Sequence, residues 1–307
     1  MEMKFEPRRE LGKTGFVATV LGVGDVADKN VPLEQCVSTV RRAMDAGLNV
    51  IDTAPSYEDG YSEAIVGSAL KGRRDSMFVI DKIDNHDDPV GPQVDASLKR
   101  LDLEMVDLFA MHGLSSIEGW AKATAFGGAF DELEKCRRAG KLRFRGISSH
   151  DPETLILAIN SGLCDVVLFA VGAYVDERFV SEVLPLAKKK NVGTVCFKTF
   201  GAGKLLCDTA GYGRPLEQRP RGKFSSGGQE KTGKNVLPCM SVEECVHYTL
   251  TCDPDVALLG MSFENEQRAA FESAKNFKPL TAEQMADIRR RAKEAVAEKG
   301  PCWWNPK

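Results

Sequence analysis

The sequence has no long apolar run and no excess of either charge. No stretch approaches the ~20 apolar residues that a membrane-spanning helix needs. The charged start MEMKFEPRREL has no apolar core after Arg8 and Arg9, so we expect no Sec or twin-arginine signal. The 41 Lys and Arg residues against 44 Asp and Glu give a net charge of -3, which provides no overall basic field for nucleic acid. We therefore expect a cytoplasmic protein whose partners include neither membrane nor nucleic acid.

Metal-ligand and disulfide spacings are also missing. None of the nine cysteines stands in a CxxC motif, and Cys239, Cys245 and Cys252 lack the spacing of a zinc or iron–sulfur site. The four histidines form no HxH or HExxH pair. These absences predict reduced, mostly buried thiols and no metal site.

The sequence does contain a regular alternation of two patterns. Short apolar, β-branched runs indicate strands, and amphipathic segments between them indicate helices. The expected strands cover 19–24, 48–53, 77–82, 105–112, 142–149, 165–171, 192–199 and 255–260. The expected helices cover 33–47, 62–72, 89–101, 129–140, 151–162, 176–191, 241–253, 264–276 and 282–300. Asp151 followed by Pro152 is typical of a helix start, and Gly162 of a helix end.

This alternation predicts the fold class. Continuous apolar strands are typical of a parallel sheet that is covered on both faces. About eight β-then-α units favour an α/β fold, a parallel eight-stranded (β/α)8 TIM barrel that forms a single domain over residues 1–307. A doubly wound open sheet is the alternative, but GVGDVADKN after the first strand lacks its glycine fingerprint. The long loop 201–238 and the tail 299–307 fall outside the alternation.

Four reactive side chains fall at the carboxyl ends of three consecutive strands, where barrel active sites lie. Asp52 ends the second strand, Lys82 the third and His112 the fourth, and Tyr57 follows in the loop after the second. Each has a structural alternative: Asp52 could cap a turn, Tyr57 could anchor a loop, and His112 could be a hydrogen-bonded core residue. Their convergence on one face favours a catalytic group.

The combination of an acid, a phenol, a lysine and a histidine suits carbonyl reduction. A carbonyl carbon that accepts a hydride needs its oxygen protonated as charge builds on it. The phenol of Tyr57 has an ordinary pKa of about 10, which a nearby ammonium such as Lys82 lowers. Asp52 would keep the buried Lys82 charged, and His112 would orient the carbonyl by a hydrogen bond.

The stretch DTAPSYEDGYSEAIVGSAL resembles the aldo-keto reductase signature, and VDASLKRLDLEMVDLFAMH resembles the segment that follows it in that family. The resemblance extends from LGKTGF to LLGMSFENEQ. It implies that Tyr57 is the general acid–base, that Lys82 lowers its pKa, that Asp52 pairs with Lys82, and that His112 positions the carbonyl. It also implies NADPH, or less often NADH, bound across the barrel mouth, and a small carbonyl or alcohol substrate.

The cofactor positions match the family less well. Ser149 replaces an asparagine, and Leu168 and Gly172 replace amide side chains that hold the nicotinamide. Glu266 stands where an arginine commonly binds the 2′-phosphate of NADPH, and Arg268 follows two residues later and could bind the phosphate instead. We therefore expect only a slight preference for NADPH over NADH. The residues that we expect at the cofactor are Gly24, Asp25, Ser148, Ser149, Phe197, Lys198, Gly201, Gly203, Leu205, Gly260, Ser262, Glu266 and Arg268.

Aromatic residues are the candidates for the substrate pocket. We expect its wall to come from residues 113–128 with Trp120, from the 201–238 loop, which would also cover the cofactor, and from the tail with Trp303 and Trp304. The two tail tryptophans could equally pack the tail onto the barrel. Sugars, steroids, quinones and small aldehydes all remain open as substrates, as does the oligomeric state.

Two other functions remain open from the sequence. Lys198 ends the seventh expected strand and could form a Schiff base as in an aldolase-type barrel, although this leaves Asp52, Tyr57 and His112 unexplained. A non-catalytic regulatory protein that binds a nicotinamide cofactor as a sensor would fit the lost amide side chains. Steady-state turnover separates the sensor from the enzyme.

Overall fold

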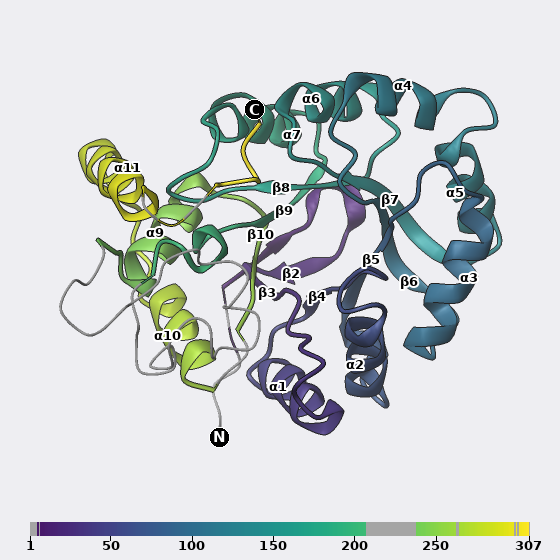
Figure 1. The fold of residues 1–307 in the computed structure, drawn as a ribbon, viewed down its shortest axis with the longest axis horizontal. Coiled ribbons are helices and arrows are strands. Elements are labelled where there is room, and N and C mark those ends of the chain that lie inside the picture. The colour runs from purple at the N-terminus through teal and green to yellow at the C-terminus, as the bar shows by residue number, and fades with distance from the viewer. Residues whose placement is uncertain are drawn as a thin grey trace.

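Eight parallel strands form a closed barrel at the centre of the computed structural model (Figure 1). The structure describes residues 5, 7–206, 238–261, 264–297, 299 and 301–306. The strands follow one another around the barrel in the order β10-β3-β4-β5-β6-β7-β8-β9. Their bounds are Leu21–Val23 (β3), Val50–Asp52 (β4), Phe78–Ile83 (β5), Val106–Met111 (β6), Leu142–Ser148 (β7), Val166–Ala170 (β8), Gly193–Phe197 (β9) and Val256–Leu259 (β10). The predicted parallel (β/α)8 barrel is confirmed: seven of the expected strands contain one of these strands, and the expected strand 77–82 overlaps β5, which ends one residue later at Ile83.

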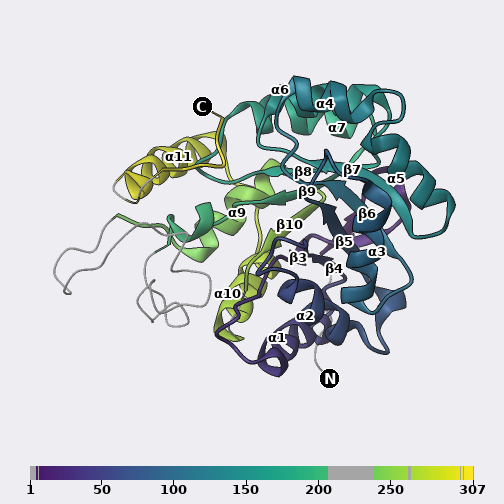
Figure 2. The ribbon, with the colours of Figure 1, turned by 45° about the vertical axis from the view of Figure 1, so that its right-hand side comes forward.

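Helices surround the barrel on its outer face (Figures 1 and 2). Their bounds are Leu33–Asp45 (α1), Tyr61–Leu70 (α2), Val90–Leu101 (α3), Ile117–Thr124 (α4), Ala129–Arg138 (α5), Pro152–Ser161 (α6), Leu184–Lys189 (α7), Val242–Cys252 (α9), Glu264–Lys275 (α10) and Ala282–Val296 (α11). Helix α4 was not expected within 113–128; it begins where the Ser116 hydroxyl accepts a hydrogen bond of 3.0 Å from the Gly119 amide. The segment before α7, Phe179–Val183, is a π-helical turn instead of regular α-helix.

Two apolar cores hold the barrel together. The inner core fills the barrel with the side chains that point inward from the strands, such as Val50, Phe78, Leu108 and Val195. The outer core lies between the strands and the helices, where the alternate residues of the same strands meet the apolar faces of the helices. The continuous apolar strand pattern in the sequence therefore reflects burial on both faces.

A β-hairpin precedes the first barrel strand and was not expected. Strands β1 (Arg8–Glu10) and β2 (Val17–Thr19) pair antiparallel. Between them, Leu11 is fully buried in the inner core, and Gly12 has a φ of +47° at a position where a Cβ would lie 2.2 Å from the Gly193 nitrogen. Because Gly193 begins β9, the hairpin closes the amino-terminal end of the barrel. Its strands have the sequences RRE and VAT, which lack the continuous apolar run that marks the barrel strands.

The cysteines depart from expectation at one position. Among the described residues, Cys36, Cys136, Cys164, Cys196 and Cys245 are buried free thiols, as expected. Cys239 is disulfide-bonded, so the expectation that all cysteines are reduced is wrong. None of the helices that the structure describes combines the length and apolar character needed to span a bilayer.

Candidate active site

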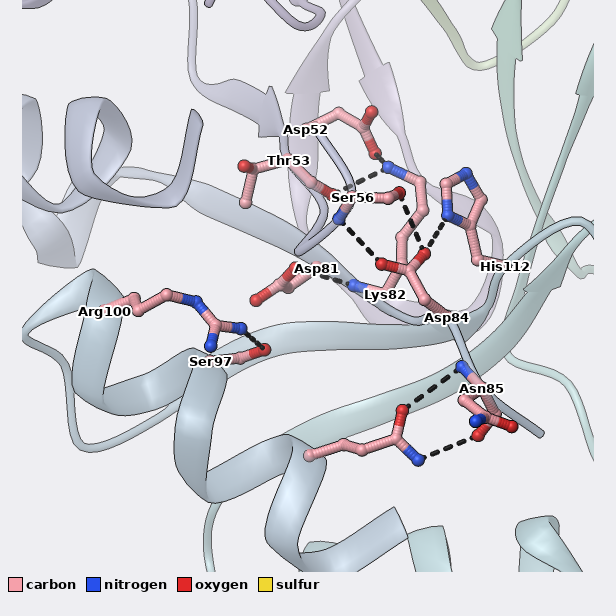
Figure 3. Close-up of polar contacts among 11 residues, drawn as sticks. Asp52, Thr53, Ser56, Asp81, Lys82, Asp84, Asn85, Ser97, Arg100 and His112 are labelled. Atoms are coloured by element: carbon pink, nitrogen blue, oxygen red, sulfur yellow. Dashed lines mark hydrogen bonds and ion pairs between the residues drawn. The ribbon is translucent and has the colours of Figure 1, made fainter. Parts of the chain in front are cut away.

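The four reactive side chains predicted at the strand ends come together at the carboxyl end of the barrel. Asp52 is the last residue of β4, Lys82 lies just before the end of β5, and His112 directly follows β6. Tyr57 lies in the loop between β4 and α2, and its ring meets that of His112 edge-on, with the centroids 5.6 Å apart. Figure 3 shows Asp52, Lys82 and His112 gathered at the ends of these neighbouring strands.

Lys82 is buried, with 2% of its side chain exposed. Its Nζ donates hydrogen bonds to Asp52 Oδ1 at 2.6 Å and to the Thr53 carbonyl at 2.7 Å, and it lies 4.6 Å from the centroid of the Tyr57 ring. Burial alone would lower the pKa of Lys82, but Asp52 and Tyr57 together raise that pKa above its ordinary value. The site thus holds a permanent ammonium against the phenol.

The pKa of Tyr57 is shifted in the opposite direction to the sequence-based expectation: it is raised, not lowered. Burial raises the pKa of Tyr57 to about 12, and the Lys82 ammonium opposes this rise without cancelling it. The expected lowering by Lys82 is present, but it is smaller than the effect of burial. The phenol therefore keeps its proton throughout the neutral range, which is the form that donates a proton.

Asp84 was missed by sequence reasoning, although it follows Lys82 by two residues. Its Oδ2 accepts a hydrogen bond from the Ser56 amide at 2.7 Å, and its Oδ1 accepts from the Ser56 hydroxyl at 3.1 Å. Its Oδ1 is also bonded to Nδ1 of His112. Figure 3 shows this carboxylate between the Ser56 loop and the His112 ring. An aspartate in a loop is too common a pattern to identify such a bridge from the sequence.

The ends of β7 and β9 carry further predicted positions. Ser148 and Ser149 are both buried, and the Ser149 hydroxyl accepts a hydrogen bond from the Asp151 amide at 3.1 Å, so it supports the start of α6. The ring of Phe197, the last residue of β9, lies 5.4 Å from that of His150. Lys198, which follows, has a φ of +75°.

A tight turn at Gly201–Gly203 follows β9. Gly201 has a φ of +54°, and a Cβ there would lie 3.0 Å from the Leu205 side chain. The nearby Thr199 Oγ1 is buried with no hydrogen-bond partner among the described residues. Leu205 is buried beneath the turn, with its amide bonded to the Phe200 carbonyl at 3.3 Å. A glycine backbone beside an unsatisfied hydroxyl suits the close approach of a dinucleotide, so the residues present fit the predicted cofactor.

Three other predicted cofactor positions lie beside one another on neighbouring strands. Gly24 directly follows β3, and Gly260 directly follows β10. A Cβ on Gly260 would lie 3.5 Å from the Asp25 carbonyl oxygen. The structure therefore brings these three positions together at the same end of the barrel.

The predicted positions at the start of α10 differ in exposure. Glu266 is buried, whereas Arg268 is exposed. Of this pair, only Arg268 therefore presents its charge to solvent. Ser262, and residues 207–237 of the predicted 201–238 loop, lie outside the described residues.

The three tryptophans occupy different environments. Trp304 is fully buried, and its Nε1 donates a hydrogen bond of 2.9 Å to the Tyr174 carbonyl. Trp303 is 58% exposed, and the Lys198 ammonium lies 4.3 Å from its ring centroid. Trp120 is buried, with its ring 5.2 Å from that of Phe130. We therefore assign Trp120 to packing between α4 and α5 instead of to the predicted substrate wall.

A closed barrel with a lysine–aspartate pair, a tyrosine and a histidine at its mouth is the arrangement that the sequence predicted for carbonyl reduction, and comparison with known proteins identifies the family. The Aldo/keto reductase family profile matches residues 19–293. The chain therefore belongs to this family and is an NAD(P)H-dependent oxidoreductase. NAD(P)H is the typical cofactor of the family, and its members act on small carbonyl compounds.

Individual relatives cover much of the chain. The uncharacterized oxidoreductase YqkF of Bacillus subtilis is 26% identical over 94% of this chain and 97% of its own. L-galactose dehydrogenase of Arabidopsis thaliana is 30% identical over 64% of this chain and 66% of its own. The fold of an aldo-keto reductase from Bacillus halodurans superposes with a TM-score of 0.70 at 23% identity, covering 96% of this chain and 98% of that one.

Proposed function

We propose that the chain reduces a small carbonyl compound to an alcohol, with Tyr57 as the proton donor. The observation that carries this proposal is the buried Lys82 ammonium, 2.6 Å from Asp52 and 4.6 Å from the Tyr57 ring centroid. As hydride reaches the carbonyl carbon, the Tyr57 phenol transfers its proton to the carbonyl oxygen, and the ammonium stabilises the phenolate that remains. Asp52 keeps the ammonium charged.

The resting protonation of Tyr57 bears on the proton-transfer step. A phenol with a pKa of about 12 is protonated at neutral pH, which is the form that carbonyl reduction uses. Alcohol oxidation would start from the phenolate, which burial disfavours. In the resting site Tyr57 therefore holds the proton that the reduction step consumes.

The bound cofactor supplies the hydride. Within this proposal, Phe197 packs against the nicotinamide, the Gly201–Gly203 turn admits the pyrophosphate, and Arg268 reaches the adenosine end. We propose NADPH as the preferred form because the exposed Arg268 can bind a 2′-phosphate, while Glu266 is buried.

The substrate in this proposal is a small carbonyl compound that enters beside Trp303, and the reaction takes place in the cytoplasm. Relatives include a methylglyoxal reductase of Escherichia coli, which is 34% identical over 38% of this chain and 39% of its own. Methylglyoxal is therefore a suitable first test compound.

The test measures methylglyoxal reduction with NADPH and with NADH, and cofactor binding by tryptophan fluorescence. We expect turnover in the wild type, with tighter binding of NADPH. Tyr57→Phe should lower kcat by about 10²–10⁴-fold while the cofactor Kd stays within about threefold. Tyr61→Phe is the matched control, because this neighbouring phenol bonds the Val31 carbonyl instead. Equal activity in Tyr57→Phe and the control would exclude Tyr57 as the proton donor.

A further inference from the structure

The ammonium of Lys198, which directly follows β9, lies among aromatic rings at the carboxyl end of the barrel. Its Nζ is 4.3 Å from the ring centroid of Trp303 and 5.5 Å from that of Phe197. The ring centroid of Trp304 is 6.0 Å away. Aromatic rings attract a cation through their electron-rich faces but do not cancel its charge. The three rings therefore position a positive charge without neutralising it.

The backbone of Lys198 is strained in a way that supports this placement. Its φ of +75° lies in the left-handed region, which residues with a side chain seldom adopt. Consecutive side chains of an extended strand point to opposite faces, but the left-handed conformation ends that alternation directly after Phe197. Strained backbone at the rim of a binding site is characteristic of functional positions.

Gly172 makes room for this conformation of Lys198. A Cβ on Gly172 would lie 2.6 Å from the Lys198 carbonyl oxygen, so a side chain at position 172 and this placement of Lys198 exclude each other. The resemblance to aldo-keto reductases led us to expect an amide side chain at position 172. In this chain the backbone of a lysine occupies that space instead.

The ring of His150 connects Lys198 with the proton-transfer side of the mouth. Its centroid lies 5.4 Å from that of Phe197 and 5.3 Å from that of Trp303, and both Lys198 and His112 are within electrostatic range of it. Burial, followed by the Lys198 charge, lowers the pKa of His150 to about 4. At neutral pH His150 therefore adds no positive charge, and Lys198 provides one within reach of the same ring as His112.

We propose that Lys198 is a substrate-binding residue that receives an anionic oxygen group, a carboxylate or a phosphate, at the end of the substrate away from its carbonyl. The carbonyl end lies at Tyr57 and His112, and the exposed ring of Trp303 covers the stem between the two ends. This inference rests on the proposed function and specifies its substrate class as an acidic carbonyl compound. It also assigns Lys198 to the substrate instead of to the cofactor.

The test compares 4-oxobutanoate with its methyl ester, because the two aldehydes differ mainly in charge. We expect the wild type to have a kcat/KM about tenfold higher for the acid, which is intermediate between an exposed and a buried ion pair. Lys198→Met should bring the ratio of acid to ester close to one, chiefly by raising KM for the acid. Lys198→Arg keeps the charge and should keep most of the preference. Added salt should reduce the wild-type preference, because it screens a partly exposed charge.

Lys122→Met is the matched control. It removes the same charge from α4, where Lys122 pairs with Asp87, and it should keep the wild-type ratio of acid to ester. Equal kcat/KM values for the acid and the ester in the wild type would overturn the proposal. An unchanged ratio in Lys198→Met would also overturn it.

Cofactor binding separates the two sources of an anionic group. If the ammonium binds the substrate, Lys198→Met should keep the Kd for NADPH within about threefold of wild type. A Kd raised about tenfold or more, with the ratio of acid to ester unchanged, would assign Lys198 to a cofactor phosphate and overturn the proposal.

A binding measurement does not depend on turnover. Succinate carries the carboxylate of the test substrate but has no reducible carbonyl, and Trp303 beside Lys198 is one of only three tryptophans in the sequence. We expect succinate to change the tryptophan fluorescence of the cofactor-bound wild type in a saturable way, and to have no effect in Lys198→Met. Trp303→Phe identifies the signal of Trp303. The absence of succinate binding to the wild type would overturn this inference, whereas a wild type that binds succinate but reduces no carbonyl compound would refute the proposed function.

Discussion

The two sides of the barrel mouth are built in different ways. On the β4–β6 side, Asp52, Lys82, Asp84 and His112 come from consecutive strands and are joined by charged hydrogen bonds. On the β8–β9 side, the contacts join distant parts of the chain, such as the Trp304 indole with the Tyr174 carbonyl. We infer that the proposed proton transfer depends on the β4–β6 side with the Tyr57 loop between β4 and α2, whereas the proposed binding of ligands depends on how the tail is attached.

The largest effect is expected on the strand side, from Lys82→Met. Removing the ammonium leaves Asp52 buried without its partner, which should lower the free energy of unfolding by about 3–5 kcal/mol and lower kcat by at least about 10²-fold. The loss of stability should be larger near pH 8 than near pH 5, because a buried unpaired carboxyl is stable only when protonated, and its ionisation favours unfolding as the pH rises. Urea unfolding at both pH values measures this.

The control for Lys82→Met is the double variant Asp52→Asn/Lys82→Met. It removes both charges and should recover most of the stability but none of the activity. If the single variant were as stable as the double, the pair would contribute no more than a surface ion pair.

On the β8–β9 side, where the tail packs, we expect substitutions to change ligand binding and to leave the chemical step nearly unchanged. Trp304→Ala removes a fully buried indole and its hydrogen bond to Tyr174. If the tail lines the substrate site as proposed, this variant should raise KM about tenfold while kcat changes by less than about threefold. Steady-state kinetics with the carbonyl substrate measures both constants. Trp120→Ala is the comparison, since it should lower the unfolding free energy by about 3 kcal/mol and leave KM unchanged. A large fall of kcat in Trp304→Ala would show that the two sides are coupled.

The smallest effect is expected at the Gly201–Gly203 turn that follows β9. Gly201→Ala places a side chain at a φ of +54° and 3.0 Å from Leu205, a strain of about 1–3 kcal/mol. We expect a cofactor Kd raised by about tenfold and a kcat at saturating cofactor close to wild type. Gly15→Ala has a φ of +70° with open space around it, far from the mouth in the β1–β2 hairpin, and should leave the cofactor Kd unchanged.

The same contrast explains what the sequence could predict. The barrel strands and the roles of Asp52 and Lys82 follow from local patterns, because a buried strand and the residue at its end are neighbours in the chain. The bridge through Asp84 depends on the loop between β4 and α2 turning back onto β5. The high pKa of Tyr57 depends on how the tertiary structure removes its hydroxyl from water, which no local pattern reports. The packing of Trp120 became apparent only when residues 117–124 proved to be a helix.

The hairpin at the start of the chain has a consequence for synthesis. Arg9 in β1 pairs with Asp253 at the end of α9, so the amino-terminal end of the barrel joins residues that are 244 positions apart in the chain. At roughly 5–20 residues per second on a ribosome, Asp253 is synthesised about 10 to 50 seconds after Arg9. Until then, the buried Leu11 lacks the β9 and β10 strands that cover it. During most of translation, the amino-terminal end of the barrel therefore lacks the strands that complete it. Chaperone contact with the β1–β2 hairpin would be most effective in this period.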